Sequence, residues 1–136
     1  MNNGRFAISV HILTLLAQDQ DEWLSSNDVA SSININPVLV RKELINLREQ
    51  GLIISKEGKQ GGSKLAISPN EISMADIYKA VRQADLLGKS INAPNENCPI
   101  GQKINKNLDD LYDTVEQNLI NQLQQTSLTN FYEKFD

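Results

Sequence analysis

The chain has 136 residues, of which 40% are hydrophobic and 22% are charged. This balance fits a globular domain with its own core and excludes an intrinsically disordered chain. No apolar run reaches the roughly 18 residues of a membrane span, and the N-terminus lacks a secretory signal, so we expect no membrane partner. One histidine, one cysteine and no complete Gly-x-x-x-x-Gly-Lys-Ser/Thr phosphate loop leave little for catalysis, so we expect no enzyme and no metal site.

The formal net charge of −4 argues at first against a nucleic-acid partner. The charges, however, are distributed unevenly along the chain. Residues 36–64 contain six lysines and arginines against three glutamates. Because screening limits charge interactions to about 10 Å at ordinary salt, a locally basic segment on an acidic body can still bind phosphate.

Residues 4–18 are predicted to form a helix that is apolar on two sides. One side consists of Phe6, Val10, Leu13 and Ala17, and the other of Ile8, Ile12 and Leu15. A helix with two apolar sides is buried between two partners. One partner is the local core, and the other is a candidate second subunit.

Two closely spaced helices are predicted next. Ser25 is the expected N-cap of the first, with Ser26 directly after it, and Asn34 suits a left-handed turn at its end. Asn36 and Pro37 are the expected cap and first turn of the second helix. This helix should end at Gly51, and its predicted buried stripe is Val40, Leu44 and Leu47.

Residues 52–55 and 64–68 are rich in branched side chains and are predicted to be strands. The segment 58–63 joins them as a glycine-rich hairpin loop. A further helix is expected from Ser73, with Ile77, Ala80, Val81 and Ala84 on its inner side. Residues 88–99 are predicted to be a loop because they combine two prolines, three asparagines and a glycine.

A long amphipathic helix is predicted from about Ile100 to Leu123. Its apolar stripe contains Ile104, Leu108, Leu111, Val115 and Leu119. Such a stripe at the end of the chain needs a cover. The second apolar side of the first helix could supply it, in the same chain or in a partner.

The order of these elements is that of a winged helix-turn-helix, a mainly α fold with a small β-hairpin wing (α+β). In this motif the second helix enters the major groove of DNA, with its N-terminal residues nearest the base edges. Arg41 could bind guanine, and Val38 could contact a thymine methyl group. The full set of predicted DNA-binding residues is Ser26, Asn36, Val38, Arg41, Lys42, Lys59, Gln60, Gly61, Gly62 and Lys64.

A role in DNA binding would explain the basic, glycine-rich tip of the predicted hairpin. A tip that approaches the phosphate backbone or the minor groove must be narrow, positive and able to adopt unusual dihedral angles. Gly61 and Gly62 are expected to supply those angles and to reduce bulk. Lys59 and Lys64 supply charge, and such phosphate contacts give affinity rather than sequence discrimination.

The sequence resembles the Rrf family of bacterial winged-helix transcriptional regulators. The resemblance rests on NPVLVRKELINLREQGLI (36–53), SKEGKQGGSKLAISP (55–69) and EISMADIYKAV (71–81), and it extends over nearly the whole chain. It implies a homodimer that binds double-stranded DNA at a palindromic operator, with the long C-terminal helix used for dimerisation. The expected division is a DNA-binding domain in 1–84, a linker in 85–99, and a dimerisation helix and tail in 100–136.

Relatives in this family that hold an iron–sulfur cluster carry three cysteines before the dimerisation helix, whereas this chain has Cys98 alone. One thiolate cannot hold a cluster, so we expect no cofactor. Cys98 is a candidate redox sensor, because a position just before a helix N-terminus favours the thiolate. The competing interpretation is an unreactive loop cysteine.

We therefore expect a cytoplasmic transcriptional repressor that binds DNA as a homodimer, with a small-molecule or protein effector that the sequence does not identify. Two alternatives stay open. One is a winged-helix module that binds proteins instead of DNA, which the acidic net charge would allow. The other is a thiol-based regulator that responds through Cys98.

Overall fold

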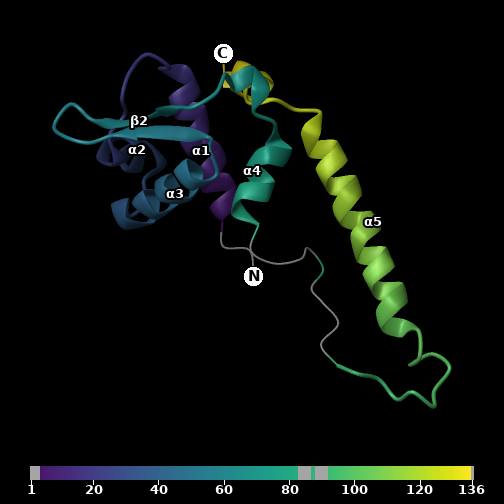
Figure 1. Cartoon of the computed structure of the whole chain (residues 1–136). Coiled ribbons are helices and arrows are strands. Elements are labelled where there is room, and N and C mark those ends of the chain that lie inside the picture. Colours follow the sequence, from purple (N-terminus) through teal and green to yellow (C-terminus); the bar gives the residue numbers. More distant parts are fainter. Residues whose placement is uncertain (1–3, 83–86, 88–91, 136) are drawn as a thin grey trace.

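The computed structural model describes residues 4–82, 87 and 92–135 and shows a mainly helical protein with one β-hairpin (Figure 1). The predicted Ala84 and much of the predicted 85–99 linker lie outside the described residues. The elements in chain order are α1 (Arg5–Gln18), α2 (Ser26–Ile33), α3 (Pro37–Glu49), β1 (Ile53–Lys56), β2 (Gly62–Leu65), η1 (Pro69–Glu71), α4 (Met74–Val81), α5 (Ile104–Gln124), α6 (Leu128–Tyr132) and η2 (Glu133–Phe135). In the described part of the chain, no helix has both the length and the apolar character that a membrane span requires.

The core is built around α1, which packs against α2, α3, α4, α6 and β2. Its side chains Ile12 and Leu13, one from each predicted apolar side, are buried, and so is Leu16. The other elements contribute further fully buried side chains, namely Val29, Val40, Leu47, Ile53, Ile72, Ile77 and Leu128. Because α1 touches both the helix pair and the C-terminal elements, it holds the two ends of the chain together.

The helix ends follow the local sequence as predicted. The Ser25 hydroxyl accepts a hydrogen bond from the Asp28 backbone N–H at 3.1 Å, which satisfies an early donor of α2. Asn34 has a φ of 64°, and this left-handed residue ends α2. The Asn36 side chain accepts from the Val38 N–H at 2.8 Å, and Gly51 follows α3 with a φ of 79°.

The hairpin begins and ends at different residues from those predicted. The antiparallel register pairs Ile53 with Leu65 and Lys56 with Gly62, so Gly62 and Ser63 belong to β2 and not to the loop. Ser63 is drawn into a strand because its backbone also pairs with Leu24, through hydrogen bonds of 2.8 and 3.1 Å. A Cβ atom at position 62 would collide with the Leu24 backbone, so glycine is required there for close approach of the two segments.

The last long helix extends away from the rest of the molecule (Figure 1). It begins at Ile104 instead of Ile100, and no residue along its 21 positions is buried. Its contact with α4 includes a polar joint at Glu116, which accepts a hydrogen bond from the Tyr78 hydroxyl at 3.1 Å and pairs with the Arg82 Nε at 2.8 Å. The pKa of Tyr78 is raised above its ordinary value, mainly by partial burial of the phenol and secondly by this hydrogen bond.

An ion pair joins α1 to the inner side of α3. Arg5 Nε lies 2.6 Å from Glu43 Oε2, and its Nη2 donates to Oε1 at 3.0 Å, so the pair is bidentate. The hydrogen bond to Glu43 raises the pKa of Arg5 above its ordinary value. The Glu43 side chain is only 9% exposed, so the ion pair satisfies a carboxylate that would otherwise be buried without a partner.

We predict that Arg5→Met lowers the free energy of unfolding by about 2 to 3 kcal/mol, because Glu43 is left buried and unpaired. Combining Arg5→Met with Glu43→Leu should return stability to within about 1 kcal/mol of the original, since a packed apolar pair replaces the charges. Urea unfolding measures both effects. Glu49→Ala, which removes an exposed glutamate from the same helix, should cost less than about 0.5 kcal/mol. A single Arg5 variant as stable as the original chain would contradict this account.

Candidate nucleic-acid interface

The surface of α3 divides into faces with different surroundings. The inner face carries the buried residues Val40, Glu43, Leu44 and Leu47. With roughly 100° between successive residues, Val38, Lys42 and Ile45 lie on the opposite, outward face, and all three are exposed, as is Glu49 at the C-terminal end of the same face. We call these three residues the outward stripe. Arg41 and Arg48 lie between the two faces, on the side of α3 nearest the hairpin.

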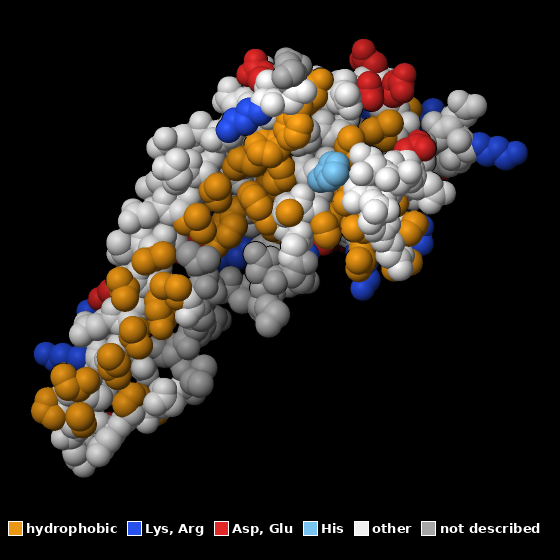
Figure 2. All heavy atoms as spheres, turned by 180° about the vertical axis from the view of Figure 1, so that it is seen from behind, with side chains coloured by type: hydrophobic (Ala, Val, Ile, Leu, Met, Phe, Trp, Pro, Cys, Tyr) orange, Lys and Arg blue, Asp and Glu red, His pale blue; other side chains and the backbone are white. Residues whose placement is uncertain are grey.

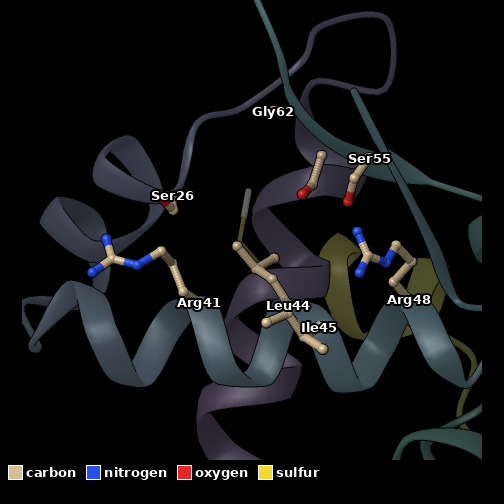
Figure 3. Close-up of a pocket in the computed structure, with 8 residues that line it drawn as sticks. Ser26, Arg41, Leu44, Ile45, Arg48, Ser55 and Gly62 are labelled. Atoms are coloured by element: carbon tan, nitrogen blue, oxygen red, sulfur yellow. The ribbon is translucent and has the colours of Figure 1, made fainter. Parts of the chain in front are cut away.

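A groove of about 220 Å³ separates α3 from the hairpin. Figure 3 shows Arg41 reaching from α3 toward Ser26 at the start of α2, and Arg48 reaching toward Ser55 on β1. The residues that line the groove are Ser26, Arg41, Leu44, Ile45, Arg48, Ser55, Gly62 and Ser63. Two guanidinium groups and three hydroxyl groups in one open groove can bind an anion such as phosphate.

The groove contains a residue that our sequence prediction did not include. Arg48 follows Arg41 by two helical turns, so both side chains leave the helix on the same side. That spacing was available from the sequence. The position of the hairpin, which turns this side of α3 into a groove, was not.

The predicted tip residues lie at the exposed end of the hairpin. Lys59 and Gln60 are exposed, and the Gly61 N–H donates to the Gly58 carbonyl at 3.0 Å to close the turn. A Cβ atom at Gly61 would collide with the Lys56 carbonyl, so this glycine makes the turn narrow. Figure 1 shows the hairpin projecting beyond the helices on the side of α2 and α3.

Lys64 is placed apart from the groove. Side chains alternate along a strand, so Lys64 points to the opposite face of the hairpin from Ser63. Its Nζ lies 4.8 Å from the centre of the Trp23 ring, and Lys56 Nζ lies 5.9 Å from the same centre. These cation–π contacts hold both lysines against Trp23, on the outer side of the hairpin.

The electrostatic balance of residues 36–64 is more positive at the surface than the sequence count indicates. Of the three glutamates in this segment, Glu43 points inward and is paired with Arg5. Only Glu49 and Glu57 remain exposed to oppose the six basic residues. A surface with this excess of positive charge attracts polyanions.

The described residues contain no group of three or more histidine, cysteine or acidic side chains that could hold a metal ion. Cys98 is exposed and lies in a run of turns before α5 begins at Ile104. The predicted position of Cys98 just before the N-terminus of that helix was wrong, because residues 100–103 form turns and the helix begins six residues after Cys98. A redox role for Cys98 stays a prediction without that support.

Comparison with known proteins identifies relatives over nearly the full chain. Residues 2–134 match the family model Rrf2, described as iron-dependent transcriptional regulator. The chain is 37% identical over 128 residues to YwnA of Bacillus subtilis (strain 168), named as an HTH-type transcriptional regulator, with 94% of each chain covered.

Two solved structures have the same fold. One, described as a DNA-binding protein, is 32% identical, with a TM-score of 0.76 over 93% of this chain and 97% of the other. The other is IscR of T. potens, 18% identical, with a TM-score of 0.73 over 100% and 88% of the two chains. The predicted winged helix-turn-helix fold is thereby confirmed. The chain belongs to the Rrf2 family, whose members are transcriptional regulators and not enzymes.

Proposed function

We propose that this regulator binds double-stranded DNA through α3 and the β1–β2 hairpin, and that it represses transcription as a homodimer on a palindromic operator. The observation that carries this proposal is the groove shared by Arg41, Arg48 and the hairpin, next to the exposed outward face of α3. A helix and a hairpin that present cations side by side match the shape and charge of a duplex.

The proposed roles of the residues follow from their positions. The outward face of α3 enters the major groove, where Arg41 donates two hydrogen bonds to a guanine. Ser26 and the N-terminal N–H groups of α3, which Asn36 caps, bind the flanking phosphates. Lys59 and Gln60 at the hairpin tip contact the backbone or the minor groove, where they add affinity without sequence preference.

The proposal of a homodimer rests on the apolar surface that a single chain leaves uncovered. Leu111 on α5 is 53% exposed, and its neighbours in the predicted stripe are at most partly buried. Figure 2 shows hydrophobic side chains along α5 and across the adjoining body. An open cleft of about 520 Å³ on the body, lined by Phe6, Val10, Leu15, Met74, Phe131 and Phe135 among others, adds to this apolar surface. A second copy of the chain would bury both the apolar stripe of α5 and this cleft.

A palindromic operator and repression follow from the dimer. Two copies related by a two-fold axis present two α3 helices in opposite directions, so the preferred half-sites are inverted repeats. A dimer that covers both half-sites within a promoter would exclude RNA polymerase.

We also propose that this member of the family acts without an iron–sulfur cluster. The family description mentions iron, but clusters are held by several thiolates, sometimes with histidines. The whole chain has one cysteine and one histidine, and these lie apart, in the turns before α5 and on α1. The donor set therefore does not fit a cluster.

The first prediction concerns DNA binding. Duplexes selected from a random-sequence library should bind with an affinity that falls steeply as salt rises. Arg41→Ala should reduce the preference for the selected duplex over random DNA, by about 1 to 3 kcal/mol at one base pair. Lys59→Ala should weaken all duplexes alike and lower the salt slope by about one. Fluorescence anisotropy over a series of salt concentrations measures both effects.

Lys106→Ala is the matched control, because Lys106 pairs with Asp110 on α5, far from the hairpin. This variant should bind as the original chain does. If the original chain binds no duplex even at low salt, the DNA-binding proposal is wrong. A module that binds proteins then becomes the better interpretation.

The second prediction concerns assembly. Leu111→Glu should convert the dimer to monomers, because it places a charge in the apolar contact, and it should lower operator affinity at least tenfold. Gln117→Glu on the far side of α5, where Gln117 bonds Asn121, should leave the dimer intact. Analytical ultracentrifugation distinguishes the two species. A monomeric original chain that binds DNA fully would contradict the proposed assembly.

The third prediction concerns iron. Protein purified without oxygen should contain no stoichiometric iron or sulfide, and an iron chelator should not change its affinity for the selected duplex. Elemental analysis and anisotropy test these two statements. A visible cluster absorption that disappears together with DNA binding on chelation would refute the proposal.

A further inference from the structure

We infer that the outward stripe of α3 reads the C5-methyl groups of thymines, with Val38 and Ile45 as two apolar probes on either side of Lys42. This inference rests on the proposed DNA-binding function and adds to it the class of base that α3 selects. Val38 is 49% exposed and Ile45 is 48% exposed, and neither side chain belongs to the core or packs against it.

The position of these two side chains is set by the buried face of α3. Val40, Glu43 and Leu47 face inward, so Val38 and Ile45 lie on the outward face, with Ile45 at the edge of the groove beside the hairpin. Leu39 is exposed to the same extent, 49%, but lies about a quarter turn further round the helix, on the side of Asn46. Asn46 faces α4 and donates to the Ala80 carbonyl at 2.9 Å. The flank of α3 that carries Leu39 is therefore turned away from the groove between α3 and the hairpin.

Valine and isoleucine cannot donate or accept hydrogen bonds, so they cannot read the polar edges of bases. Thymine is the one common base that offers an apolar group, its C5-methyl, in the major groove. Two apolar side chains on the face of α3 that would enter that groove therefore match two thymines. Lys42 between them, with Arg41 beside it, can bind acceptors on the intervening bases.

The spacing of the probes predicts the spacing of the thymines. Val38 and Ile45 are separated by two helical turns, which is roughly 10 Å along the axis. If the axis follows the groove, this distance corresponds to about three base pairs, at about 3.4 Å each. The half-site should therefore contain two thymines about three base pairs apart, on either strand.

The test uses the full chain and the best duplex selected from the random library, in which each thymine is replaced in turn by uracil. Uracil differs from thymine only by the missing methyl group, so pairing and polar edges are kept. We expect about a fourfold loss of affinity at each of two positions, because one methyl group is no longer buried. Val38→Ala should abolish the loss at one position, and Ile45→Ala should abolish it at the other.

Leu39→Ala is the matched control and should keep both losses. Thermal unfolding of the variants should match that of the original chain, since all three side chains are exposed. If every uracil duplex binds the original chain within twofold of the thymine duplex, the methyl inference is overturned, while the DNA-binding proposal stands. It is overturned equally if Leu39→Ala, and not Val38→Ala or Ile45→Ala, removes the losses. If no duplex is selected, the proposed function fails and this inference fails with it.

Discussion

The rotation of α3 about its own axis is the constraint on which the proposed interface depends. The bidentate Arg5–Glu43 pair fixes this rotation, because Glu43 is held on the inner side of the helix by a residue of α1. Apolar side chains such as Leu47 would by themselves tolerate small rotations, whereas a carboxylate held by two hydrogen bonds from one arginine does not. A buried charge pair adds little stability over packed apolar residues. Here its contribution is to direct Val38 and Ile45 outward, Arg41 toward the start of α2 and Arg48 toward the hairpin.

The other wall of the groove is held at its base by backbone contacts. Leu24, between α1 and α2, pairs with Ser63 of β2, and Gly62 allows the two backbones to approach. This contact attaches the hairpin to the helix pair at its base, while the turn around Gly61 stays at the exposed end. The width of the groove beside Arg48 is therefore set at the attached base of the hairpin.

Much of this fold could be predicted from the sequence, because its signals are local. The caps at Ser25 and Asn36 and the capping box at Ser73 depend on residues within one helical turn, and all three are present. The failures involve long-range contacts. No local pattern shows that Ser63 pairs with Leu24, that Lys64 packs on Trp23, or that Glu43 faces Arg5, since each partner is tens of residues distant. Composition alone counted Glu43 against DNA binding, and only its burial removes it from that balance.

The same packing couples the proposed dimer contact to the proposed DNA interface. Helix α1 touches both α3 and α4, and α4 holds α5 through the Glu116 joint with Tyr78 and Arg82. In a two-fold dimer built on α5, the direction in which α5 leaves the body determines the separation of the two α3 helices. That separation must match about one turn of DNA, roughly 34 Å, or a multiple of it. In the proposed dimer, a displacement of Glu116 would therefore change the separation of the two α3 helices without any contact to α3.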